Sequence, residues 1–191
     1  MGRVVTIYAA ALALITAWAP AATPPDEPPE TAGERDVRLE SIAFALAEVA
    51  HAAPRGLSGS VAAAGVLTVW AAETHFDRYI HAGIPHPDPA LHEDHGRARC
   101  LGSIHRSARM TLEEWRGLAG TSREATTRCA LATLRALRSS FWICARGESV
   151  NVDTLARTLE QYATGHSCEA GAESRRRAQA WIDVIPCLRR R

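Results

Sequence analysis

The sequence predicts a mainly helical protein with a single domain, and three observations support this prediction. The chain has 191 residues, enough for one medium-sized domain with its own hydrophobic core. Apolar residues recur at helical spacing in about six segments, which indicates about six helices. No segment shows a convincing strand pattern, and no internal repeat is present.

Residues 1–21 have the layout of a secretory signal peptide. Arg3 is followed by an apolar run to Trp18 and then by small residues around Ala21. The alternative is a membrane anchor, but Pro20 interrupts the run before it reaches the roughly 20 apolar residues that a spanning helix needs. We therefore predict export to the periplasm or the extracellular space, cleavage near Ala21, and no stable membrane anchor.

Residues 22–35 are predicted to be a flexible linker and residues 36–191 the helical domain. The linker contains Pro24, Pro25, Pro28 and Pro29 and almost nothing apolar. A first helix is expected from Asp36 until Pro54 closes it. Ser58 can cap a second helix, which stays apolar all round to Ala72 and should lie in the middle of the domain. Later helices are expected at 111–115, 122–141, 152–162 and 173–185.

Residues 81–103 are too rich in Gly and Pro to form a helix, so we expect a long loop or a small irregular sheet. Loops of this length inside compact domains are usually functional. This segment is therefore expected to form part of an active site.

The charge balance argues against nucleic acid as a partner. All 22 basic residues are Arg, and they face 21 acidic residues, which gives a net charge of +1. No excess positive charge remains for a phosphate-binding surface. No motif indicates a cofactor, and we expect a monomer.

The five cysteines are expected to form two disulfides, because thiols tend to pair in an oxidising compartment. We favour Cys100 with Cys129 and Cys144 with Cys168, which leaves Cys187 free. Other pairings remain open at this point. None of the cysteines forms a Cys-x-x-Cys pair that would indicate a zinc or redox site.

Glu73 stands out as a carboxylate at the end of the predicted buried helix, between Trp70-Ala71-Ala72 and Thr74-His75-Phe76. A carboxyl group in apolar surroundings is suited to act as a general acid near neutral pH. The alternative is an ordinary acidic residue at a helix end, paired with Arg78 or His75. Position alone does not separate the two interpretations.

Three short motifs resemble the lysozyme-like superfamily, in particular the soluble lytic transglycosylases and the goose-type lysozymes. Glu73-Thr74-His75-Phe76 is similar to the Glu-Ser-x-Phe end of the catalytic helix in that family. The segment Cys100-Leu101-Gly102-Ser103-Ile104 is similar to Gly-Leu-x-Gln-Ile, with Cys at the glycine and Ser at the glutamine. Tyr162-Ala163-Thr164-Gly165 is similar to Tyr-Asn-x-Gly, with Ala at the asparagine.

The resemblance implies a lysozyme-like fold and cleavage of the bond between N-acetylmuramic acid and N-acetylglucosamine in peptidoglycan glycan strands. Glu73 would be the single catalytic acid and base. The substrate-binding residues implied are Ser103, Ile104, His105, Tyr162 and Gly165. Glycosidases usually use two carboxylates, and the candidates for a second one are Asp88, Glu93 and Asp94, of which we favour Asp94. The loop 81–103 would form one wall of a cleft, with Glu73 at its floor and Tyr162 opposite.

Two other functions stay open. Loss of the family's Gln and Asn fits a catalytically inactive relative that only binds glycan or another wall protein. A zinc or copper site is a less favoured alternative, because six histidines fall within residues 75–105: His75, His81, His86, His92, His95 and His105. His92 and His95 are three residues apart, whereas the metallopeptidase motif places its histidines four apart on one helix face, so we predict no metal site.

Overall fold

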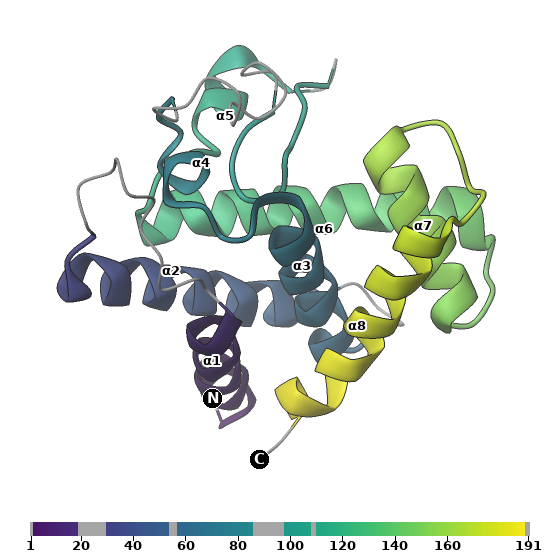
Figure 1. The fold of residues 1–191 in the computed structure, drawn as a ribbon, viewed down its shortest axis with the longest axis horizontal. Helices are drawn as coiled ribbons and strands as arrows, with labels where there is room; N and C mark the ends of the chain where they lie inside the picture. The colour runs from purple at the N-terminus through teal and green to yellow at the C-terminus, as the bar shows by residue number, and fades with distance from the viewer. Residues whose placement is uncertain (1, 19–29, 54–56, 86–97, 108–109, 190–191) are drawn as a thin grey trace.

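The computed structural model describes residues 2–18, 30–53, 57–85, 98–107 and 110–189, and its fold is mainly helical (Figure 1). The helices are α1 (Gly2–Trp18), α2 (Ala32–His51), α3 (Gly59–Thr74), α4 (Arg78–Ala82), α5 (Leu112–Arg116), α6 (Arg123–Ala145), α7 (Val152–Thr164) and α8 (Ala172–Arg189). The mainly helical prediction is confirmed. No strand occurs in these ranges, so the part of the 81–103 segment that can be described contains no sheet.

Helix α3 is the core of the domain, as its apolar sequence predicts. Every residue from Ser60 to Trp70 is buried. Helices α2, α6 and α8 all pack against α3 (Figure 1). On the α8 side, a Cβ at Gly65 would lie only 2.2 Å from the Trp181 ring, so glycine is what allows these two helices to approach so closely.

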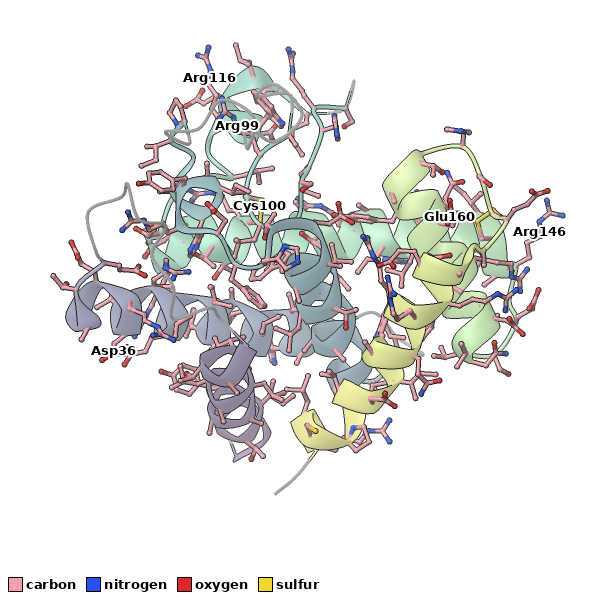
Figure 2. The ribbon with its side chains drawn as sticks, viewed as in Figure 1. Asp36, Arg99, Cys100, Arg116, Arg146 and Glu160 are labelled. Carbon is pink, nitrogen blue, oxygen red and sulfur yellow. A yellow bond between two sulfur atoms is a disulfide. The ribbon has the colours of Figure 1, made fainter. Side chains whose placement is uncertain are left out.

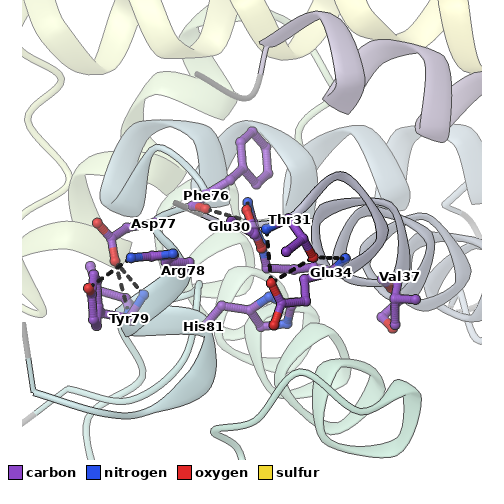
Figure 3. A network of polar contacts seen from close by, with 12 residues as sticks. Glu30, Thr31, Glu34, Val37, Phe76, Asp77, Arg78, Tyr79 and His81 are labelled. Atoms are coloured by element: carbon purple, nitrogen blue, oxygen red, sulfur yellow. Dashed lines mark hydrogen bonds and ion pairs between the residues drawn. The ribbon is translucent and has the colours of Figure 1, made fainter. Parts of the chain in front are cut away.

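Helix α2 begins at Ala32 rather than at Asp36. The reason is a capping box, in which Thr31 accepts a hydrogen bond from the Glu34 amide and the Glu34 side chain accepts one from the Thr31 amide. Just before it, Glu30 pairs through both carboxylate oxygens with Arg38, at 2.7 and 2.9 Å (Figure 3). Residues 30–35 therefore belong to the folded domain, although we predicted them to be linker.

The short helix α4 was not predicted. Asp77 caps it, because its Oδ1 accepts hydrogen bonds from the amides of Tyr79 and Ile80 at 2.7 and 3.0 Å (Figure 3). Gly83 ends it with a φ of 71°. One turn is too short for periodicity to reveal, and the glycines and prolines that follow masked it.

Helix α4 buries His81 against α6. The side chain is 1% exposed, and its Nε2 lies 2.9 Å from Thr126 Oγ1. Burial, with a smaller contribution from the positive charge of Arg38, lowers the pKa of His81 to about 3. His81 is therefore a neutral core residue at physiological pH.

Both favoured disulfides are present. Cys100 and Cys129, with Cα atoms 6.1 Å apart, tie the segment after residue 98 to α6 (Figure 2). Cys144 and Cys168, 5.5 Å apart at Cα, tie the end of α6 to the segment between α7 and α8. Cys187 is half-buried and carries no disulfide.

Helix α1 packs against α2 and α8, with Ala11 and Ile15 fully buried. None of the helices described is long and apolar enough to cross a membrane. Export and removal of residues 1–21 remain predictions.

Candidate active site at the carboxyl end of α3

The three motif-bearing segments meet at the carboxyl end of α3. Thr74, next to Glu73, donates its hydroxyl to the Trp70 carbonyl at 2.9 Å and approaches the Leu101 carbonyl at 3.3 Å. The Tyr162 hydroxyl, at the end of α7, donates to the carbonyl of Gly102. Residues 27 and 60 positions apart in sequence are thus joined by direct polar contacts.

Both contacts are made by a tight turn, residues 99–104, whose two ends are hydrogen-bonded to each other. The amides and carbonyls of Arg99 and Ile104 exchange two hydrogen bonds, at 3.1 and 2.9 Å. Inside that pair, the Ser103 amide donates to the Cys100 carbonyl at 3.0 Å. Cys100 and Ser103 have φ values of 58° and 48°, in the left-handed region that glycine adopts most easily. The tight turn therefore has a fixed shape, which the Cys100–Cys129 disulfide attaches to α6.

Gly102 lets this turn press against the core. A Cβ at this position would lie 2.1 Å from Thr133 Oγ1 and 3.3 Å from Trp70 Nε1. Those two side chains are themselves hydrogen-bonded, with Trp70 Nε1 donating to Thr133 Oγ1 at 3.2 Å. Residues 99–104, α3 and α6 thus meet in one buried contact at Trp70, which lies about one helical turn before Glu73 on α3.

Glu73 lies at the end of α3 with a side chain that is 22% exposed. Its Oε1 accepts a hydrogen bond from Arg177 Nη1 of α8 at 2.7 Å. Arg177 also donates through Nε to Glu173 at 2.9 Å. The purely apolar surroundings that we expected for Glu73 are therefore wrong in one respect, because a guanidinium lies against the carboxylate.

The sequence analysis missed Arg177 as a site residue. It belongs to the run Arg175-Arg176-Arg177, in which the first pairs with Asp153 and the second with Glu173. Of the three, Arg177 is the one for which the structure gives a contact with α3. The run itself indicates a charged helix face, and only the packing of α8 on α3 selects the member that reaches Glu73.

The other predicted substrate-binding residues have structural roles of their own. The Ile104 carbonyl, besides its bond to Arg99, accepts from Trp115 Nε1 at 2.9 Å. The amides of Ser103 and Ile104 both donate within the turn, to the Cys100 and Arg99 carbonyls. Gly165 ends α7 with a φ of 75° and accepts from Gln161 Nε2 at 2.9 Å. Ser103 is half-buried and His105 exposed.

Some predicted features fall outside the part of the chain that is described. Asp94, the candidate second carboxylate, is among them, and so are His86, His92 and His95 and most of the expected cleft wall. Within the described ranges, no group of three or more His, Cys, Asp or Glu side chains could hold a metal ion.

A second feature lies at the opposite, amino end of α3. A cavity of about 390 Å³ opens between the start of α3, the second half of α6 and the loop before α7. Its walls are mostly apolar and include Leu57, Val61, Leu137, Phe141, Trp142 and Trp181.

Comparison with known proteins gives no match: the chain matches no family model, no curated protein and no solved structure.

Proposed function

We propose that the protein is an exported glycosidase of the lytic transglycosylase type. It cuts the bond between N-acetylmuramic acid and N-acetylglucosamine in peptidoglycan, with Glu73 as its single acid and base. The observation that carries this proposal is the convergence described above. The residue proposed as the acid, the Gly-Leu-type turn and the Tyr-x-x-Gly tyrosine come from three distant parts of the sequence, and hydrogen bonds join their segments.

The backbone of the turn gives separate support for the alignment. Cys100 stands where the family motif has glycine, and its φ of 58° is one that glycine adopts without strain. A non-glycine residue held in this conformation costs free energy, and such strain gathers at functional sites. In this chain the disulfide to Cys129 holds the turn in that shape.

In this mechanism Glu73 protonates the glycosidic oxygen and then acts as a base, while a group of the muramic acid itself closes on the anomeric carbon. Tyr162 keeps the turn against the end of α7 by its bond to the Gly102 carbonyl. The Ser103 hydroxyl takes the place of the family's Gln amide towards the acetamido group of the sugar. A hydroxyl is shorter than that amide, so we expect weaker binding of the glycan but unchanged chemistry.

A second candidate is a binding module without activity, and one observation favours it. Oε1 of Glu73, an oxygen that could carry the proton to the leaving group, is occupied by Arg177. If that contact persists when glycan is bound, Oε1 cannot deliver a proton, and the site can hold a strand without cleaving it through this oxygen.

Digestion of peptidoglycan by the purified protein, followed by mass analysis of the products, separates these functions. Anhydromuramyl ends indicate a transglycosylase, reducing ends a hydrolase, and no release a binding module.

The Glu73→Gln variant should lose at least about 100-fold in rate, the usual contribution of general acid catalysis. Its amide oxygen still accepts from Arg177, so its melting temperature should stay near that of the wild type. Glu113→Gln, an exposed acid on α5, is the control and should cleave normally. Wild-type rates in Glu73→Gln would exclude the proposed mechanism.

A further inference from the structure

Among the residues that the structure describes, Arg177 is the charged side chain that contacts the carboxylate of Glu73, and the contact is built into the fold. The two residues are 104 positions apart, and the side chain of Arg177 is only 28% exposed. The packing of α8 on α3 fixes their approach, because Gly65 lies against the Trp181 ring and Trp181 Nε1 donates to the Val61 carbonyl at 2.9 Å. The packing of the two helices therefore holds Arg177 next to Glu73.

This contact competes with the proposed chemistry. A general acid must direct its own O–H at the leaving oxygen from hydrogen-bond distance. With the guanidinium in place, Oε1 instead accepts a hydrogen bond at 2.7 Å. Cleavage through this oxygen requires Arg177 to move away first.

Arg177 can leave Glu73 without losing every partner. Its Nε bonds Glu173, which lies one turn earlier on the same helix, and that bond does not involve Nη1. The nitrogen that turns away from Glu73 can therefore bind a new acceptor. A guanidinium is best matched by a carboxylate, with which it forms two parallel hydrogen bonds.

We propose that Arg177 is a specificity-determining latch. It holds Glu73 in the resting protein, and it frees Glu73 when its guanidinium binds a carboxylate carried by the substrate instead. The substrate class is then a glycan with an acidic substituent next to the bond that is cut. This inference rests on the proposed function, because muramic acid supplies such carboxylates: its own lactyl group where that is free, and the side chains and end of the attached peptide where the lactyl carboxyl is in an amide bond. A neutral chain of N-acetylglucosamine has the same backbone and no group to take Arg177. Arg177 thus binds the substituent of the substrate and controls the position of Glu73, without contacting the reacting atoms.

The test compares cleavage of peptidoglycan strands with cleavage of neutral chitin oligosaccharides, as kcat and KM for each. The wild type should favour the anionic strands by at least about 10-fold in kcat/KM, a difference of about 1.4 kcal/mol. In Arg177→Gln we expect kcat on chitin to rise and the preference to fall to about 2-fold or less. Arg177→Lys keeps the charge without the paired donors, so its preference should lie between the two.

Arg175→Gln is the matched control, because Arg175 lies two residues earlier on α8 and pairs with Asp153 instead. Its preference should equal that of the wild type. If the wild type is active and Arg177→Gln keeps the full preference, the latch is wrong and the glycosidase proposal stands. If the wild type cleaves neither polymer, both proposals fall.

A binding measurement on the unaltered protein avoids the risk that a variant misfolds. The Nε–H signal of Arg177 in ¹⁵N NMR reports directly on the guanidinium. Titration with N-acetylmuramic acid should shift this signal, whereas N-acetylglucosamine, which lacks the carboxylate, should leave it in place. Equal shifts with both sugars would overturn the latch, since they would show that the carboxylate is not what Arg177 senses.

Discussion

The two ends of α3 are built in different ways, although they belong to one buried helix. At the amino end, Val61 and Trp181 line a mostly apolar cavity of about 390 Å³. At the carboxyl end, Thr74 and Tyr162 hold a turn whose own backbone groups are paired, and Glu73 meets Arg177. The amino end is packed mainly by apolar side chains, with a hydrogen bond from Trp181 to Val61, whereas several polar contacts hold the carboxyl end.

The difference shows where chemistry is to be expected in this fold. An apolar cavity of this size is in the range of small-molecule sites, yet it lacks the converging polar groups that chemistry requires. The carboxyl end combines strained backbone, a half-buried acid and a cation from a third helix. Residues that line the cavity without setting the packing of α8 on α3 should therefore affect stability alone, and residues at the carboxyl end should affect stability and activity together.

The two disulfides give the largest test of this contrast. Replacing Cys100 and Cys129 by Ala opens a loop of 29 residues, and replacing Cys144 and Cys168 opens one of 24. In the chain-entropy model each loss costs roughly 3 to 4 kcal/mol of unfolding free energy, measured by urea denaturation. We expect similar losses of stability, but only the first pair should also reduce peptidoglycan cleavage, because it holds the turn at Cys100. Equal activity in the two variants would contradict a functional role for the turn.

The pH dependence of the unfolding free energy should reveal His81, a buried residue of α4, the helix that follows the carboxyl end of α3. Burial lowers the pKa of His81 to about 3, below the 6.5 of an unfolded chain. At pH values between these two, the unfolded chain binds more protons than the folded protein. The contribution of neutral His81 to the unfolding free energy is therefore complete above pH 6.5 and is lost as the pH falls towards 3. From pH 7.5 to pH 4.5 this loss is on the order of 3 kcal/mol.

The control for this prediction is His81→Gln, whose amide can still reach Thr126. Urea denaturation of both proteins at pH 7.5 and pH 4.5 gives the comparison. The variant should lose less stability on acidification than the wild type. The same loss in both proteins would assign the acid sensitivity to other groups.

Much of this architecture could be predicted from the sequence, and the failures have physical causes. The apolar run from Val61 to Ala72 predicted the core helix because only a buried helix can be apolar all round. The start of α2 was placed four residues late, because prolines at 24–29 outweighed the capping box of Thr31 and Glu34. The short motifs predicted that their segments lie near one another, and hydrogen bonds join Thr74 to Leu101 and Tyr162 to Gly102, whereas the Glu73 carboxylate contacts Arg177. Arg177 could not be predicted, since the register of α8 against α3 is set by the contact of Gly65 with Trp181, and no local pattern encodes it.

A matched pair of glycines tests two contacts of α3, with α8 at Gly65 and with the turn at Gly102. An added Cβ would lie 2.2 Å from the Trp181 ring at Gly65 and 2.1 Å from Thr133 Oγ1 at Gly102. Overpacking of this kind costs typically 1 to 3 kcal/mol, so Gly65→Ala and Gly102→Ala should both lower the melting temperature. Gly102→Ala should also reduce the rate of cleavage by the folded protein, because it displaces the turn from α3. Gly65→Ala shifts α8 and with it Arg177, so it should weaken the preference for anionic strands without lowering the rate on peptidoglycan. A loss of rate in Gly65→Ala alone would contradict our placement of the site at the turn.

The smallest effect is expected from the hydroxyl of Tyr162, which joins α7 to the turn through the Gly102 carbonyl. Tyr162→Phe keeps the ring and removes the donor, so the unfolding free energy should fall by about 1 kcal/mol. The turn would lose its attachment to α7 while keeping its disulfide to Cys129, and we expect KM for glycan strands to rise with little change in kcat. Tyr79→Phe is the control, because that hydroxyl accepts a hydrogen bond from Arg78 on the same short helix, α4. If Tyr162→Phe instead lowered kcat and left KM unchanged, the hydroxyl would act on the reacting atoms rather than on the position of the turn.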